Sequence, residues 1–358
     1  MDMTGTLHPG GVDKSKIRRI LIRATNWIGD MVISLPALEA VRNNFPESEI
    51  VILARPWVVP LIEHHPSVDR IIPIGKGKDF FTRFMEFIRV AGMIRRSKFD
   101  LAILFQNAFG AALLTYMGKV EVRVGYDVDF RRFLLSHPVT RDKSVMESHQ
   151  VEYYIAILRA MGWDVKTGNP MLYVGEKDSK SVNSLLLREG ISPKDELMGL
   201  SPGAIYGPAK RWPAERFATI GDWAAERWGT KVVIMGSSRE TDICRFLAER
   251  MKYAPLNLCG RTTLGQAMAL IKRCNFFVTN DSGLMHIAAA LDVPMVAIFG
   301  STDHVATGPL SKKAKIVRIQ TDCSPCLKAE CPTDFRCMLG IDPENVWREL
   351  ETLKEHMS

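Results

Sequence analysis

Short apolar segments alternate with helical stretches along almost the whole chain, and this alternation restricts the fold more than any other feature of the sequence. Short runs rich in Val, Ile and Leu are typical of buried strands. Longer stretches with an apolar residue at every third or fourth position are typical of helices that pack on a core. Because strands that alternate with helices form parallel sheets covered by helices, we predict an α/β protein.

The same strand and helix pattern fills both halves of the chain. The predicted strands span residues 18–24, 49–54, 69–74, 99–105 and 121–124, then 197–201, 231–235, 256–259, 275–279, 295–299 and 316–319. The predicted helices span residues 29–44, 79–96, 107–117 and 147–161, then 178–189, 214–228, 240–251, 264–273, 282–291 and 343–356.

The length of the chain predicts two domains. With 358 residues, 46% of them hydrophobic, it exceeds the size at which one core usually divides. We expect a flexible tail over residues 1–16, a first domain over 17–175, a second domain over 176–342 and a last helix within 343–358. No apolar stretch is long enough for a membrane span, and the first 15 residues lack the apolar centre of a secretory signal. We therefore expect a cytoplasmic protein.

Residues 276–291, with the sequence FFVTNDSGLMHIAAAL, place a helix directly after a buried strand. A strand that leads into a helix N-terminus presents backbone N–H groups to which an anion can bind. Ser282 is suited to cap this helix, Gly283 allows a ligand to approach the backbone, and His286 follows in the first turn beside Asn280 and Asp281. A capped turn of this kind also occurs in α/β proteins that bind nothing there.

A second junction follows the strand predicted at 197–201. Its loop, from Pro202 to Pro213, contains the sequence GPAKRWP, and Pro213 suits the first turn of the next helix. Lys210 and Arg211 would thus lie near a helix start, where they either bind an anion together with the first junction or are ordinary solvated charges.

A third loop, residues 23–30 with the sequence RATNWIGD, follows the first predicted strand. Asp30 begins the next helix, where a carboxylate interacts favourably with the helix dipole. A carboxylate in a ligand site can also act as a general base. The residues alone leave both roles open.

These three motifs, in the order in which they occur along the chain, resemble those of the lipopolysaccharide heptosyltransferases, the ADP-heptose glycosyltransferases of family 9. The resemblance extends from residue 20 to about 309 and implies the GT-B architecture, in which two Rossmann-like domains face each other across a cleft. It also implies that the last helix packs back toward the first domain. The chain is most similar to the branch that adds the second heptose to the first heptose of the lipopolysaccharide inner core. These enzymes use ADP-heptose as the donor and invert the configuration at the anomeric carbon.

The resemblance implies a role for each motif. Asp30 is expected to be the catalytic base, in preference to His286, which would lie among phosphate-binding groups. The residues expected to bind the donor are Lys210, Asp281, Ser282, Gly283, Leu284, His286, Thr262, Glu240, Gly203 and Ala204. Of these, Asp281 is assigned to heptose hydroxyls because a carboxylate repels phosphate, and Glu240 suits a helix start equally well. Backbone N–H groups and Lys210 would stabilise the leaving diphosphate, so we expect no required metal or cofactor.

The acceptor is expected to bind the first domain. Thr25, Asn26, Arg55, Arg123 and Arg131 are the candidates for contacts with the sugar and with Kdo carboxylates or phosphates, and Lys76, Lys78 and Arg132 are further basic candidates. The expected acceptor is heptosyl-Kdo2-lipid A. An enzyme of the same family that uses a Kdo acceptor, and a nucleotide-binding protein without turnover, remain alternatives. A dinucleotide oxidoreductase is disfavoured because the first loop lacks G-x-G-x-x-G.

Charge and cysteines add two further features. The net charge is +7, and residues 70–132 hold twelve Lys and Arg against six Asp and Glu. Within that stretch, the helix predicted at 79–96 is basic and rich in Phe; we favour packing on the domain core, with binding to the anionic inner-membrane surface as the alternative. No nucleic-acid-binding motif is present. Cys323, Cys326, Cys331 and Cys337 are spaced C-x2-C-x4-C-x5-C, which is not a standard zinc-ribbon pattern. Four thiols this close could hold structural zinc or an iron–sulfur cluster, or they could be reduced thiols or a disulfide pair, which a reducing cytoplasm disfavours.

Overall fold

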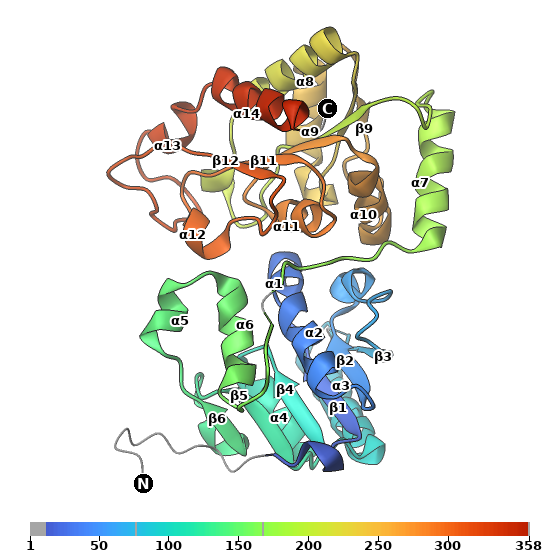
Figure 1. Ribbon diagram of the computed structural model, residues 1–358, viewed down its shortest axis with the longest axis vertical. Helices are drawn as coiled ribbons and strands as arrows, with labels where there is room; N and C mark the ends of the chain where they lie inside the picture. The colour runs from blue at the N-terminus through green and yellow to red at the C-terminus, as the bar shows by residue number, and fades with distance from the viewer. Residues whose placement is uncertain (1–11, 76, 167, 357–358) are drawn as a thin grey trace. The chain divides into compact units, whose positions relative to one another are not determined.

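The computed structural model describes residues 12–75, 77–166 and 168–356, and its course is drawn in Figure 1. Two compact units meet in the chain at Gly168 and Asn169, slightly before the predicted boundary at 175. Of the predicted flexible tail, residues 1–11 lie outside the described part. Residues 14–16, at the end of the predicted tail, form a short 3-10 turn, η1 (Lys14–Lys16), capped by Asp13.

The first unit contains a six-stranded parallel sheet. Its strands are β1 (Arg19–Arg23), β2 (Glu49–Ala54), β3 (Arg70–Pro73), β4 (Leu101–Leu104), β5 (Val122–Tyr126) and β6 (His137–Val139), in the order β3-β2-β1-β4-β5-β6. Its helices are α1 (Ile28–Ile33), α2 (Leu35–Asn44), α3 (Phe80–Ser97), α4 (Phe109–Met117), α5 (Lys143–Glu147) and α6 (Gln150–Arg159), with the turns η2 (Pro56–Leu61) and η3 (Arg132–Leu134). The first five strands confirm the prediction, whereas β6 was not predicted.

The helix predicted at 29–44 is two helices. The chain breaks at Ser34, whose hydroxyl donates to the carbonyl oxygen of Met31 at 2.8 Å. A serine that bonds back to its own turn competes with the helical hydrogen bonds, and Pro36 lacks an N–H to continue them. Asp30 therefore lies in a short helix of its own, α1.

The second unit repeats the same topology. Its strands are β7 (Leu197–Ser201), β8 (Lys231–Ile234), β9 (Leu256–Asn257), β10 (Phe276–Asn280), β11 (Met295–Ile298) and β12 (Ala314–Val317), in the order β12-β11-β10-β7-β8-β9. Its helices are α7 (Glu176–Arg188), α8 (Ala214–Trp228), α9 (Thr241–Arg250), α10 (Leu264–Arg273), α11 (Gly283–Ala290), α12 (His304–Thr307), α13 (Arg336–Leu339) and α14 (Pro343–Glu355), with the turns η4 (Pro208–Lys210) and η5 (Ser238–Glu240).

The last helix, α14, packs on the core of the second unit. Its buried face, led by Trp347 and Leu350, belongs to the core that α8 and the second sheet form. The indole of Trp347 lies 4.5 Å from that of Trp228 in α8, measured between ring centroids. Helix α14 therefore completes the core of the second unit, because its apolar stripe matches the stripe of α8.

In both sheets the first strand lies beside the fourth, with the second and third strands on its other side. Such a reversal of strand order leaves a crevice at the carboxyl ends of the two central strands, which is where open α/β sheets bind ligands. In the first unit, the loop that leaves β1 at this point leads into α1, which contains Asp30. Residues 202–213 and 281–283 leave β7 and β10 at this point in the second. Within the described residues, no helix combines the length and apolar character that a membrane span requires.

Candidate active site

The junction between β10 and α11 is built as the sequence predicts. Ser282 has an extended backbone, and its hydroxyl accepts a hydrogen bond from the N–H of Met285 at 3.4 Å. This cap starts α11 at Gly283 and leaves the N–H groups of Gly283 and Leu284 in the first turn, where an α-helix has no internal acceptor for them. His286 lies in the same helix and is buried. The junction can therefore bind an anion through backbone N–H groups and the helix dipole.

Lys210 and Asp281 form an ion pair next to this helix start. The ammonium nitrogen of Lys210 lies 2.6 Å from Oδ2 of Asp281, and their side chains are 14% and 5% exposed. The hydroxyl of Thr302 donates to the same carboxylate oxygen at 2.6 Å. Lys210 also lies over the ring of Tyr206, 4.9 Å from its centroid. Asp281 thus positions Lys210, and the ammonium of Lys210 keeps two further N–H groups for a ligand.

Asn280 holds the two loops of the second unit together. Its side-chain oxygen accepts from the N–H of Trp212 at 3.0 Å, and its amide nitrogen donates to the carbonyl oxygen of Pro202 at 2.8 Å. Asn280 and Trp212 are fully buried, so these bonds are shielded from water. Arg211 donates to the carbonyl oxygen of Ala204 at 3.2 Å. The structure therefore assigns Arg211 to the loop backbone, and only Lys210 of the two basic residues pairs with Asp281.

Gly203 lies against Glu240. A Cβ atom at position 203 would lie 1.9 Å from Oε1 of Glu240, so no residue larger than glycine fits without displacing that carboxylate. The other oxygen, Oε2, accepts from the N–H and the hydroxyl of Ser237, both at 2.7 Å. The helix-start interpretation of Glu240 is confirmed by this capping box. Thr262 is half-buried and precedes the first turn of α10 at the same edge of the sheet.

In the first unit, Asp30 lies near a buried tyrosine. Burial, and after it the negative charge of Asp30, raises the pKa of the Tyr154 hydroxyl well above its usual value. Tyr154 of α6 therefore stays protonated beside the half-buried Asp30. No local pattern in the sequence could have indicated this pair, because it joins α1 to a helix more than a hundred residues later.

The loop between β1 and α1 is fixed by a buried arginine that sequence reasoning missed. Arg23 donates to the carbonyl oxygen of Leu53 at 3.1 Å and to the side-chain oxygen of Asn26 at 3.0 Å. Burial, and secondly the positive charge of Arg55, lowers the pKa of Arg23 to about 9. Asn26 is thus already bound through its oxygen. Thr25 is buried, and its hydroxyl has no hydrogen-bond partner within the described structure.

The basic acceptor candidates fall into two groups. Arg131 is fully buried and bonds to the carbonyl oxygen of Tyr126 at 2.8 Å and to Asn107 Oδ1 at 2.9 Å, at the carboxyl ends of β4 and β5. Arg55 bonds to the carbonyl oxygen of Gly75 at 2.6 Å, also beyond a carboxyl end. The structure brings both to the edge that carries Asp30.

Arg123 lies elsewhere. It is the second residue of β5, at the amino end of the sheet, and its guanidinium binds the carbonyl oxygen of Leu134 at 2.7 Å. The structure does not bring Arg123 to the other candidates. Arg132 pairs with Asp127 on the surface, Lys78 is exposed, and Lys76 lies outside the described residues.

Comparison with known proteins shows to which family the chain belongs. The family model "Glycosyltransferase family 9 (heptosyltransferase)" matches residues 87–335. The chain belongs to glycosyltransferase family 9. It is 31% identical to lipopolysaccharide heptosyltransferase 2 of Salmonella typhimurium over 94% of this chain and 98% of the relative. The solved structure of ADP-heptose heptosyltransferase II of Escherichia coli is 29% identical, covers 95% of this chain and 100% of its own, and has a TM-score of 0.82. A family 9 structure from Veillonella parvula, 26% identical, covers 94% and 97% with a TM-score of 0.84.

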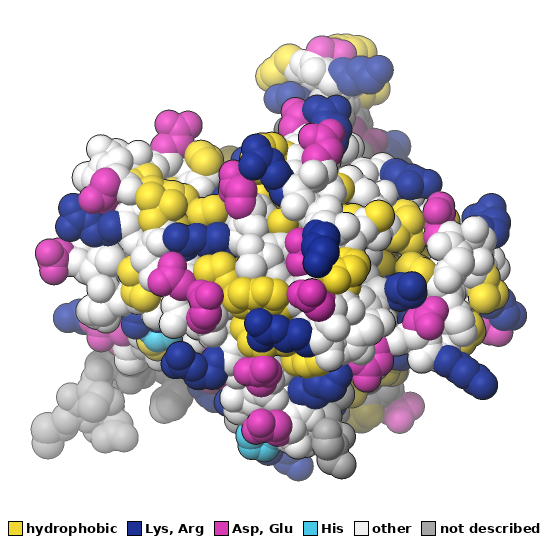
Figure 2. Space-filling view, turned by 90° about the horizontal axis from the view of Figure 1, so that it is seen from above, with side chains coloured by type: hydrophobic (Ala, Val, Ile, Leu, Met, Phe, Trp, Pro, Cys, Tyr) yellow, Lys and Arg dark blue, Asp and Glu magenta, His cyan; other side chains and the backbone are white. Residues whose placement is uncertain are grey.

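These likenesses confirm the predicted GT-B class of α/β fold and identify the chain as a glycosyltransferase of the heptosyltransferase family. The donor candidates lie at one edge of the second sheet. On the face drawn in Figure 2, Lys and Arg side chains are interspersed with Asp and Glu, so the positive charge does not form a single basic patch there. Thr302, Tyr154 and Arg23 are the site neighbours that sequence reasoning missed. Of the three, only Thr302 had a local signal, since it follows the end of β11.

Proposed function

We propose that this family 9 glycosyltransferase transfers L-glycero-D-manno-heptose from ADP-heptose to the first heptose of the lipopolysaccharide inner core. The observation that carries the proposal is the β10–α11 junction, where a capped helix start lies beside the ammonium of Lys210. Such a junction suits the diphosphate of a nucleotide sugar. The likeness to proteins named heptosyltransferase 2, over nearly the whole of both chains, supports the choice of sugar and acceptor.

The second unit would bind the donor. The N–H groups of Gly283 and Leu284 and the ammonium of Lys210 would meet the two phosphates, where negative charge grows as the bond to the sugar breaks. Asp281 would accept hydrogen bonds from heptose hydroxyls through Oδ1, because its Oδ2 is already taken by Lys210 and Thr302. Glu240 and Thr262, at the same edge of the sheet, are proposed neighbours of the ribose and adenine.

The first unit would bind the acceptor and supply the base. The acceptor oxygen attacks the anomeric carbon, the bond from that carbon to the phosphate oxygen breaks, and ADP leaves with the bonding electrons. The hydroxyl proton passes to the carboxylate of Asp30, and the configuration at the anomeric carbon inverts. The neutral phenol of Tyr154 would help to hold that carboxylate in place. Thr25, Asn26, Arg55 and Arg131 are the proposed acceptor contacts at this edge.

The proposal predicts one heptose added per acceptor. The purified enzyme with ADP-heptose and heptosyl-Kdo2-lipid A should yield a product heavier by one heptose residue, together with an equal amount of ADP, and mass spectrometry measures both. Addition to Kdo2-lipid A lacking heptose would instead identify the Kdo acceptor as the substrate. Tight binding of ADP without any product from either acceptor would favour a binding protein without turnover.

We further propose that helix α3 holds the enzyme on the anionic inner-membrane surface, at its cytoplasmic face, where a lipid-linked acceptor resides. Helix α3 packs on the core through the buried Val90, Ala91 and Ile94 and through the half-buried Phe87. The preferred interpretation, in which the apolar stripe packs on the core, is thus confirmed from Phe87 onward and is wrong for the part of the helix before Phe87. Its large apolar side chains are exposed instead, with Phe80 at 85% and Phe81 at 68%.

The charges near this exposed surface match the proposed membrane. Phe84, Met85 and Ile88 continue the apolar surface of Phe80 and Phe81, and Arg83, Arg89, Arg95, Arg96 and Lys98 are exposed on the same helix or at its end. Exposed aromatic rings together with basic residues are typical of helices that lie in the headgroup region of anionic membranes.

Replacing Phe80, Phe81 and Phe84 together by Ser is expected to weaken binding to phosphatidylglycerol vesicles by at least about tenfold, because burying a Phe contributes about 1.5–3 kcal/mol. Vesicle sedimentation at low and high salt measures the effect, and salt should weaken the binding of the unaltered enzyme. The matched control is Leu187→Ser, which removes an exposed apolar side chain from α7 of the second unit. Equal binding by the triple variant and the control would exclude α3 as the membrane surface.

A further inference from the structure

Four of the seven cysteines lie in α13 and in the loop between β12 and α13. Cys323 is exposed, Cys326 and Cys331 are half-buried, and Cys337 is buried, all as free thiols. The other three cysteines are buried in the core of the second unit. The clustering of cysteines is therefore specific to this part of the second unit.

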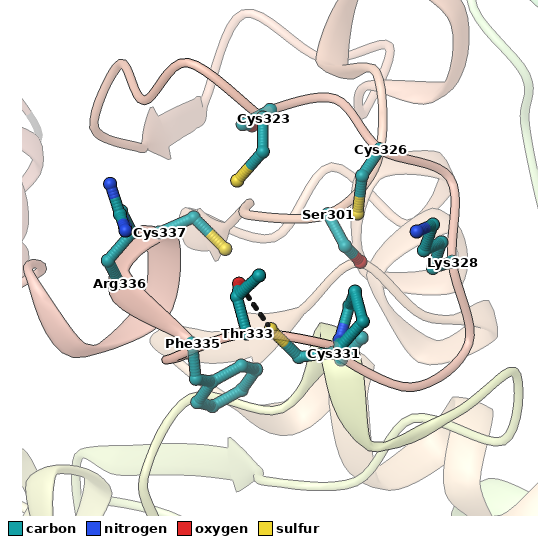
Figure 3. A pocket seen from close by; sticks show the side chains of 12 residues that line it. Ser301, Cys323, Cys326, Lys328, Cys331, Thr333, Phe335, Arg336 and Cys337 are labelled. Carbon is teal, nitrogen blue, oxygen red and sulfur yellow. Dashed lines mark hydrogen bonds between the residues drawn. The ribbon is translucent and has the colours of Figure 1, made fainter.

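All four thiols line one cavity of about 140 Å³. Figure 3 shows the sulfur atoms of Cys323, Cys326, Cys331 and Cys337 turned toward a shared central space. Three of the four residues come from the loop and Cys337 comes from α13, so the cavity lies between the loop and the start of this helix.

A second observation at the same cavity points to a ligand. Ser301, which also lines it, is 1% exposed, and within the described structure its hydroxyl has no hydrogen-bond partner. A buried hydroxyl without a partner costs roughly 1–3 kcal/mol, so native proteins seldom keep one unless something else occupies the site. Lys328 and Arg336 line the cavity as well and would offset negative charge on the sulfur atoms.

We propose that the four cysteines bind a single tetrahedral metal ion, zinc or iron, as thiolates. Four thiolates are the ligand set that these ions prefer, and the first pair has the C-x2-C spacing of structural zinc sites. As the side chains stand, no three His, Cys, Asp or Glu residues among those described are close enough to hold an ion. Rotation about the single Cα–Cβ torsion of each cysteine moves the sulfur without moving the backbone, so binding would draw the thiols inward.

The ion would brace a loop that supports the donor site. The N–H of Ala209 donates to the carbonyl oxygen of Ala329 at 2.9 Å, and the hydroxyl of Tyr206 donates to that of Leu327 at 2.8 Å. A Cβ atom at Gly207 would lie 2.2 Å from the carbonyl oxygen of Ala329, so the two loops touch closely. Ala209 directly precedes Lys210, and the ammonium of Lys210 lies over the ring of Tyr206, so the ion acts as a positioning element for Lys210. This consequence, unlike the metal site itself, rests on the proposed donor site.

The test is the metal content of the full chain, purified without oxygen and with zinc and iron both present during growth. We expect about one ion per chain, measured by elemental mass spectrometry, and no acid-labile sulfide. The variant Cys323→Ser/Cys326→Ser should lose most of the ion, whereas the matched control Cys274→Ala, which removes a buried thiol from outside the cavity, should keep it. Cobalt added to the metal-free unaltered chain should give the charge-transfer absorption of cobalt bound by thiolates.

Several results would overturn the metal site: a zinc-treated chain without metal, equal metal in the double variant, labile sulfide, or a disulfide between two of the four cysteines. Circular dichroism establishes that the double variant is folded. If it is folded and lacks metal, its affinity for ADP should fall about three- to tenfold, within the range of a single loosened contact. Metal content does not depend on heptose transfer, so failure of the metal site and failure of the proposed function give different results.

Discussion

Replacing Asp30 by Asn is expected to lower heptose transfer by about a thousandfold or more while ADP binds almost as before. A positioned general base contributes about 10²–10⁴ to a rate, and the amide of Asn cannot accept the acceptor proton. The change leaves the shape of α1 intact, because the backbone of Asp30 accepts the bond from Ser34 in either case. Rates of product formation measure the first effect, and calorimetry with ADP measures the second.

The matched control for this variant is Glu63→Gln, which neutralises an exposed carboxylate of the same unit. Its transfer rate should equal that of the unaltered enzyme. Loss of ADP affinity in Asp30→Asn, in proportion to the loss of rate, would show that Asp30 supports the donor site or the fold. Full activity of Asp30→Asn would assign the base to another residue, and the pH dependence of the rate would then indicate which group titrates.

The order of strands and helices was predictable because it depends on local patterns. Strand β2 and helices α8 and α10 have the predicted bounds, since each is a strongly periodic segment between clear start and stop signals. Strand β6 was missed because it has three residues, one of them Pro138, at the edge of the sheet. The apolar stripe of α14 indicates that the helix is buried, but it does not indicate that the helix belongs to the core of the second unit.

The parts of the site that depend on one junction were predicted, and the parts that join distant segments were not. Ser282 was identified as a cap because the strand, the serine and the helix are contiguous. The pairing of Lys210 with Asp281 joins residues 71 positions apart, and each had been assigned a separate ligand. Arg123 was grouped with the acceptor residues by charge alone, whereas its place at the amino end of β5 became visible only from the register of the sheet.

The pairing of Lys210 with Asp281 leads to the second large effect. Lys210→Ala removes a charge-assisted hydrogen bond to the diphosphate, worth about 1.5–3 kcal/mol, which is a tenfold to hundredfold loss of ADP affinity. It also leaves the carboxylate of Asp281, 5% exposed, without its cation. An unpaired buried carboxylate beside a diphosphate repels it, so the single variant should bind ADP even more weakly than the lost hydrogen bond implies.

The double variant Lys210→Ala/Asp281→Asn separates these two contributions. Because it removes both charges, it should bind ADP about tenfold more tightly than Lys210→Ala alone, although more weakly than the unaltered enzyme. Asp281→Asn by itself should keep ADP affinity but lose transfer, because ADP has no heptose for Asp281 to hold. Calorimetry with ADP on all three variants, with thermal unfolding as the check on folding, gives the complete cycle. Unchanged ADP affinity in Lys210→Ala would show that Lys210 does not bind the diphosphate, because both the lost hydrogen bond and the repulsion by the unpaired Asp281 should weaken ADP binding.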